Sequence, residues 1–199
     1  MAKGDQMKEK ILRAALKLFR KKGYLGTSML DIAAEVGLTK GGIYHYIAKK
    51  EDLLRELHDE MVDAVFERHA RMVDPERDPG RKLENWIRSH ASIMHDYLAQ
   101  ITVFFTEMEH LDKANLKRTI QRRDAFHKAL TDIIAEGIRA GQFKESIDPN
   151  VAALLILGTL NWYYQWYRPD GEFSIDELAE MTIQVICHGL YKESAKHPE

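Results

Sequence analysis

Residues 27–46 read TSMLDIAAEVGLTKGGIYHY, and this stretch decides the fold of the chain. Thr27 or Ser28 can cap a first short helix, and Thr39 can cap a second one. Gly37 ends the first helix, while apolar residues at helical spacing give both helices one face to bury. Two short capped helices joined by a glycine turn are typical of a helix-turn-helix, whose second helix is free to enter the major groove of DNA.

Helical spacing of apolar residues continues along the rest of the chain, without a clear strand or hairpin pattern. The spacing predicts helices over residues 6–22, 28–36, 39–46, 49–72, 81–99, 101–109, 113–140, 149–167 and 174–192. Asp148 and Pro149 are typical of an N-cap and a first helical residue. We therefore expect an all-α fold of about nine helices, with an N-terminal helix-turn-helix domain at 1–50 joined by a long helix to a C-terminal helical domain at 51–199.

The composition indicates a packed globular protein. Of the 199 residues, 45% are apolar and 30% are charged, which excludes extensive disorder. The one cysteine, Cys187, cannot form an internal disulfide, and residues 1–10 lack the apolar stretch of a signal peptide. No segment reaches the roughly 18 apolar residues that cross a bilayer. We expect a cytoplasmic protein without a membrane partner.

The charge is distributed unevenly. Residues 1–50 contain eleven Lys and Arg against four acidic residues, a net charge of +7, whereas the whole chain carries −2. The remaining residues therefore carry −9. A basic region on an acidic body is what binding of a polyanion such as DNA requires, although solvated surface lysines give the same count.

The stretch from about residue 8 to residue 54 resembles the DNA-binding domain of the TetR family of transcriptional repressors. The matching positions are Phe19, Gly23-Tyr24, Thr27, Ile32-Ala33, Val36-Gly37, Lys40-Gly41, Tyr44-His45 and Lys50-Glu51-Asp52-Leu53-Leu54. Ile47 departs from the pattern, because the family commonly has phenylalanine there. This departure concerns the packing beneath the second helix of the motif rather than its exposed face.

The resemblance implies a set of contacts with double-stranded DNA. Thr27 and Ser28 would meet phosphate, and Lys50 would hold phosphate at the start of the fourth helix. The major-groove set would be Thr39, Lys40, Gly41, Gly42, Tyr44 and His45. Gly42 lets the backbone approach the bases, so DNA shape would carry part of the specificity. His45 is alternatively an ordinary surface residue.

In this family the C-terminal helices form a dimer and a ligand chamber. Residues 151–157 are apolar nearly all round their helix, and the last helix adds Ile183, Ile186, Cys187, Leu190 and Tyr191. We expect these two helices to join two copies into a homodimer, whose two-fold axis matches a palindromic operator. The alternative is a monomer with a thick core.

The aromatic run from Trp162 to Tyr167, with Phe104-Phe105 and Arg122-Arg123, is similar to a subgroup of the family that senses acyl-coenzyme A thioesters, including repressors of fatty-acid and steroid degradation. That resemblance implies an acyl-CoA effector and no other cofactor. The expected ligand-binding residues are Met94, Phe104, Phe105, Met108, Arg118, Arg122, Arg123, Phe126, Trp162 and Trp166. Plain core or dimer packing is the alternative for the aromatics, and a solvated face paired with nearby acids is the alternative for the arginines.

Two other functions are open from the sequence. Glu107 with His110 and Asp124 with His127 have the spacing used in di-iron helical bundles, but no helix offers the two further buried carboxylates. The second of these functions is that of a helical module that binds another protein through its basic region. We expect no catalytic residues and no metal, and favour a DNA-binding repressor released by a small apolar effector, an acyl-CoA thioester. The first alternative is a TetR-type regulator of efflux or other genes that responds to a different hydrophobic ligand.

Overall fold

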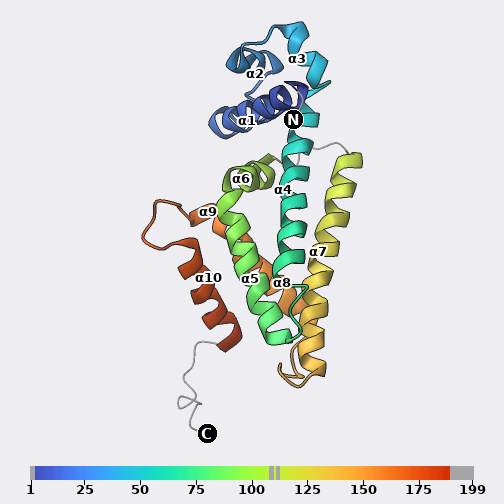
Figure 1. Cartoon of the computed structure of the whole chain (residues 1–199), viewed down its shortest axis with the longest axis vertical. Helices are drawn as coiled ribbons and strands as arrows, with labels where there is room; N and C mark the ends of the chain where they lie inside the picture. The colour runs from blue at the N-terminus through green and yellow to red at the C-terminus, as the bar shows by residue number, and fades with distance from the viewer. Residues whose placement is uncertain (1–2, 108–109, 111–112, 189–199) are drawn as a thin grey trace. The chain divides into compact units, whose positions relative to one another are not determined.

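The computed structural model describes residues 3–107, 110 and 113–188, and every regular element in these residues is helical (Figure 1). The elements are α1 (Lys3–Lys22), α2 (Met29–Val36), α3 (Lys40–Tyr46), α4 (Lys50–Met72), α5 (Pro79–Asp96), α6 (Leu98–Glu107), α7 (Lys113–Arg139), α8 (Pro149–Asn161), α9 (Tyr163–Trp166), α10 (Ile175–Ile183) and the π-helical turn η2 (Gln184–His188). The expected all-α class is confirmed.

The chain forms two compact units. The first contains residues 1–64 and 97–124, and the second contains residues 65–96 and 125–199. Helices α4 and α7 each contribute one part to each unit. No helix in the described residues is long and apolar enough to cross a membrane.

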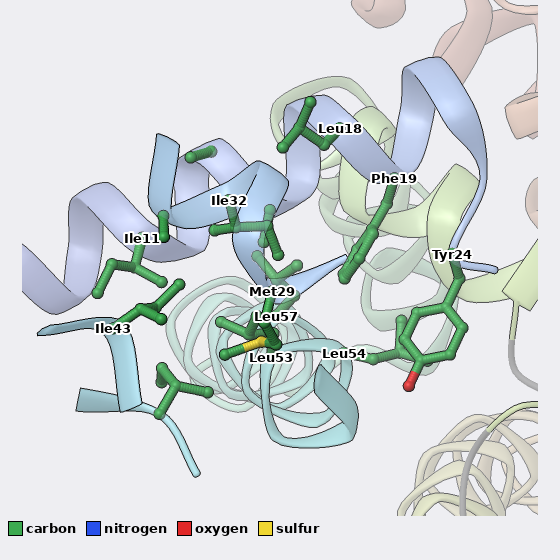
Figure 2. Close-up of a cluster of buried hydrophobic side chains, with 14 of the residues drawn as sticks. Ile11, Leu18, Phe19, Tyr24, Met29, Ile32, Ile43, Leu53, Leu54 and Leu57 are labelled. Atoms are coloured by element: carbon green, nitrogen blue, oxygen red, sulfur yellow. The ribbon is translucent and has the colours of Figure 1, made fainter. Parts of the chain in front are cut away.

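The core of the first unit gathers side chains from α1, α2, α3 and α4 (Figure 2). Ile11, Ile32, Ile43 and Leu53 are fully buried there, and each such side chain contributes about 1.5–3 kcal/mol through burial. Ile47, the departure from the family pattern, lies in the same core directly after α3. It packs beneath α3, as expected.

The helix-turn-helix forms because local hydrogen bonds fix both helix starts and the turn. The Ser28 hydroxyl accepts from the Asp31 N–H at 3.1 Å, and the Asp31 carboxylate accepts in return from the Ser28 N–H at 2.8 Å. Gly37 ends α2 at φ +73°, a left-handed conformation that favours glycine. Thr39 then caps α3 by accepting from the Gly42 N–H at 3.1 Å. The caps expected at Ser28 and Thr39 are confirmed.

In the second unit, α10 packs along α5, and α8 also contacts α5. The helix expected over residues 149–167 is interrupted at Trp162, where α8 ends and the short α9 follows. The interruption turns Tyr163 and Tyr167 inward; the Tyr163 hydroxyl donates to the Leu178 carbonyl at 3.2 Å. Trp162 and Trp166 stay exposed. The tail of the last expected helix, from residue 189, lies outside the described residues.

Candidate nucleic-acid interface and ligand-binding residues

Helix α3 presents its polar face to solvent. Ile43 faces the core, whereas Lys40, Gly41, Tyr44 and His45 are exposed. Ser28 and Thr39 are also exposed, each at the start of its helix, and Gly42 is half-buried. Most of the expected DNA contacts thus lie on one short helix, α3, with its N-cap Thr39, while Ser28 lies at the N-cap of α2.

Thr27 occupies a different place from the other expected contacts. Its side chain is 1% exposed, and its hydroxyl donates to the Gly23 carbonyl at 2.9 Å. This hydrogen bond fixes the turn between α1 and α2. We therefore leave the Thr27 side chain out of the contacts proposed below.

Lys50 is bound within the first unit. Its Nζ donates to the carbonyl of Tyr24 at 2.7 Å and to that of Thr27 at 2.8 Å, and lies 4.1 Å from the centroid of the Tyr24 ring. Burial, with smaller contributions from Glu51 and Asp52, raises the pKa of Tyr24 to about 12. Lys50 therefore ties the start of α4 to the turn that precedes α2, a role that the sequence pattern alone did not indicate.

The other cations of the first unit divide into paired and unpaired groups. Lys17 pairs with Glu35 at 2.6 Å, and Lys22 pairs with Asp31 at 3.2 Å, so both hold α1 against α2. Lys40, at the start of α3, is exposed and forms no ion pair with a described residue. It is the exposed cation best placed for a phosphate.

The expected arginines of α7 face acidic residues of α4. Arg118 lies 3.6 Å from Asp59, and Arg122 lies 3.6 Å from Asp59 and also pairs with Asp63. Arg123 pairs with Asp124 at 3.5 Å on the surface. Nearby on α7, a shallow surface pocket of about 410 Å³ is lined by Lys113, Leu116, Lys117, Ile120 and Gln121.

The expected apolar ligand residues divide between the two units. Phe104 and Phe105 belong to the first, where Phe104 stacks on His58 with 4.2 Å between ring centroids. Burial lowers the pKa of His58 to about 4. Met94 is buried in the second unit, and Phe126 packs there against Trp86 at 4.9 Å. Met108 lies outside the described residues.

Trp162 and Trp166 border an apolar groove between α8–α9 and α10. The groove has a volume of about 720 Å³ and also contains Leu154, Leu155, Gly158, Met181 and Val185. Leu155 is 68% exposed, although it is large and apolar. A continuous apolar surface of this kind marks a site of association.

Comparison with known proteins connects both units to one family. Residues 11–57 match "Bacterial regulatory proteins, tetR family", and residues 76–190 match "Tetracyclin repressor-like, C-terminal domain". The chain is 25% identical over 184 residues to the HTH-type transcriptional repressor KstR2 of Mycobacterium tuberculosis, covering 92% of each chain. It is 26% identical over 187 residues to the fatty acid metabolism regulator protein of Bacillus subtilis, covering 92% of this chain and 95% of that protein.

The chain is also similar to a protein whose structure has been solved as a complex. The crystal structure of AibR in complex with isovaleryl coenzyme A and operator DNA aligns with a TM-score of 0.81 at 26% identity, covering 90% of this chain and 97% of that chain.

The metal-carboxylate enzyme considered from the sequence is wrong, because the relatives and the matched family are regulators. Glu107 lies 3.5 Å from His110, and Asp124 forms an ion pair with Arg123. Within the described part of the chain, no three His, Cys, Asp or Glu side chains gather as metal ligands. The chain, matched to this family in both its N-terminal and its C-terminal residues, belongs to the TetR family of bacterial transcriptional regulators.

Proposed function

We propose that the chain is a homodimeric repressor that binds a palindromic operator and is released by a small apolar effector, an acyl-CoA thioester. The observation that carries the proposal is α3, a capped helix whose buried Ile43 orients its polar face outward. Residues 1–50 bind DNA in this proposal, and residues 51–199 bind the effector and form the dimer.

The DNA contacts come from residues exposed on or beside α3. Ser28 and Thr39 meet phosphate at the two helix starts, and Lys40 adds a charge-assisted contact. Gly41 and Gly42 admit the backbone close to the bases, and Tyr44 and His45 reach the groove. Lys50 acts from behind this surface, by holding the turn before α2 in place.

The dimer forms through the groove between α8–α9 and α10. Leu154 and Leu155 project into solvent from α8, Met181 does so from α10, and Val185 does so from η2. Packing against the same surface of a second copy buries both sets, and a two-fold arrangement places one α3 in each half of a palindrome.

The effector assignment rests on aromatic residues in an apolar interior and on basic residues of α7. Phe126 and its neighbours supply the apolar surface for an acyl chain in the second unit. Arg118, Arg122 and Arg123, which belong to the first unit, are the kind of cation that phosphates such as those of coenzyme A prefer. The AibR complex with isovaleryl coenzyme A and operator DNA supports this class of effector for a related fold.

The proposal is tested by measuring, with fluorescence anisotropy, how the chain binds DNA from the region upstream of the gene that encodes it. The binding is measured at 50 mM and at about 200 mM salt, with decanoyl-CoA, isovaleryl-CoA or the matching free acids. We expect salt to weaken the binding and only the thioesters to release the DNA. DNA binding that ignores every thioester would remove the acyl-CoA assignment and leave a regulator of another apolar ligand, whereas DNA affinity insensitive to salt would contradict the proposed interface.

A further inference from the structure

Four aromatic rings from three helices form a tight cluster in the second unit. They are His69 of α4, Trp86 and His90 of α5, and Phe126 of α7. Phe126 lies 4.8 Å from His69 and 5.6 Å from His90 between ring centroids, and Trp86 stacks on His90 at 5.2 Å. His69, Trp86 and His90 are 8%, 1% and 6% exposed, whereas Phe126 is only half-buried. Phe126 is thus the ring through which the cluster meets the surface.

Three nitrogens of this cluster have no hydrogen-bond partner among the described residues. They are His69 Nε2, Trp86 Nε1 and His90 Nδ1, and all three are buried. The remaining imidazole nitrogens are paired: His69 Nδ1 with the Val65 carbonyl at 2.9 Å, and His90 Nε2 with Asn161 Oδ1 at 3.1 Å. Folded proteins keep unpaired buried polar atoms rare, because each one loses water without gaining a partner. Three on neighbouring rings therefore indicate a polar partner that binds there.

The hydrogen-bonding character of these nitrogens follows from their neighbours. Burial lowers the pKa of His69 to about 4 and that of His90 to about 3, so both imidazoles are neutral at pH 7. A carbonyl oxygen can only accept, so the proton of His69 is on Nδ1 and its Nε2 is an acceptor. His90 donates from Nε2 to the Asn161 amide oxygen, and its Nδ1 is an acceptor too. Trp86 Nε1 can only donate.

We infer that His69, Trp86 and His90 recognise an uncharged hydroxyl group on the apolar part of the effector. A hydroxyl accepts from the Trp86 N–H while it donates to an imidazole nitrogen. A carboxylate only accepts and would face two lone pairs, and a saturated chain would leave all three nitrogens unpaired. The inference rests on the proposed function, in which the second unit holds the effector, and it deepens that proposal by naming the group that is recognised.

Phenol and benzene test the inference, because phenol differs from benzene only by a hydroxyl group. The full-length chain is labelled with ¹⁵N-tryptophan, and the indole signal of Trp86 is assigned with Trp86→Phe. We expect phenol to bind about tenfold more tightly than benzene and to move the Trp86 indole N–H signal downfield. The paired substitution His69→Phe with His90→Phe removes both acceptors and should abolish the preference, whereas His127→Phe on α7 should retain it.

Equal affinities for phenol and benzene, or an unmoved Trp86 signal at saturating phenol, would overturn the inference. If the doubly substituted chain does not fold, the Trp86 signal of the unsubstituted chain decides. The acyl-CoA release assay fails separately: a phenol preference without release by thioesters would reject that effector class and leave the hydroxyl site standing.

Discussion

Individual cations of the first unit have distinct tasks. Lys50 is bound to two main-chain carbonyls and Lys17 is paired with Glu35, whereas Lys40 is exposed beside the Thr39 cap. Through these partners Lys50 and Lys17 hold neighbouring segments of the first unit together, a structural task that Lys40 does not have among the described residues. Sequence counting adds all eleven basic residues of 1–50 together, and only the structure separates them by task.

Substitution of Lys40 should weaken operator binding without loss of stability. Lys40→Ala removes one phosphate contact per protomer, so the slope of log affinity against log salt should fall by about 1 for each lysine lost. Anisotropy titrations over a series of salt concentrations measure this slope. Lys128→Ala is the matched control, because Lys128 is an exposed lysine of the second unit paired with Asp132. An unchanged slope in Lys40→Ala would exclude a phosphate contact at this residue.

Buried neutral histidines make stability sensitive to acid. Burial holds the pKa of His58 and of His69 at about 4, below the value of about 6.5 in the unfolded chain. Their contribution is complete above pH 6.5 and is lost as the pH falls toward 4, because the unfolded chain then binds more protons. We expect the free energy of unfolding to fall from pH 7 to pH 4.5, by at most about 1.4 kcal/mol per pH unit for each histidine, and the urea midpoint to fall with it. His58→Gln should flatten this decline, and a midpoint that is independent of pH would contradict it.

Among the elements, α7 shows how a close contact fixes a helix end. A Cβ added at Gly137 would lie 2.2 Å from the ring of Phe143, which folds back after the helix. Gly137→Ala should therefore destabilise the chain by about 1–2 kcal/mol in urea unfolding, despite the better helix propensity of alanine. Gly41→Ala in α3, where a new Cβ meets nothing within 4 Å, should cost no stability. Equal stability of the two variants would show that Phe143 moves away freely.

The apolar surface of α8 supplies the test of the dimer. Leu155→Asp places a charge in the groove and should convert the proposed dimer to a monomer, which sedimentation velocity measures directly. Ile147→Asp is the control, because Ile147 is exposed but lies outside the groove. Dimers that persist in Leu155→Asp would move the interface elsewhere. Operator affinity should fall together with dimerisation.

Local chemistry explains which elements could be predicted from the sequence. The caps at Ser28, Thr39 and Asp148 lie next to the residues that they serve, so α2, α3 and α8 begin where the sequence indicates. The interruption at Trp162 could not be predicted in this way. Tyr163, the first residue of α9, is bound instead to Leu178, fifteen residues after it, whose carbonyl accepts from the Tyr163 hydroxyl.

In the whole molecule, too, a candidate site could be predicted from the sequence only where its residues lie close together along the chain. The residues proposed to contact DNA lie within one short stretch of sequence, residues 28–45, and a single motif indicates nearly all of them. The described residues proposed to bind the ligand come from α5, α6, α7, α9 and Trp162 between α8 and α9, and sequence alone did not indicate that Phe104 and Phe126 lie in different units. Nor did it connect His69 with His90, since only the packing of α4 on α5 places both beside Trp86.

The pairing of Arg118 and Arg122 with Asp59 and Asp63 has a consequence for how an anionic ligand would act. A phosphate that engages these arginines takes them from the carboxylates of α4, so binding is an exchange of counter-ions rather than the filling of an empty site. The helix that loses its counter-ions is the one that begins at Lys50, beneath the turn before α2. A charged effector would then act by breaking the ion pairs between α7 and α4. Replacing Asp59 and Asp63 with neutral residues would break the same ion pairs and mimic the effector in its absence.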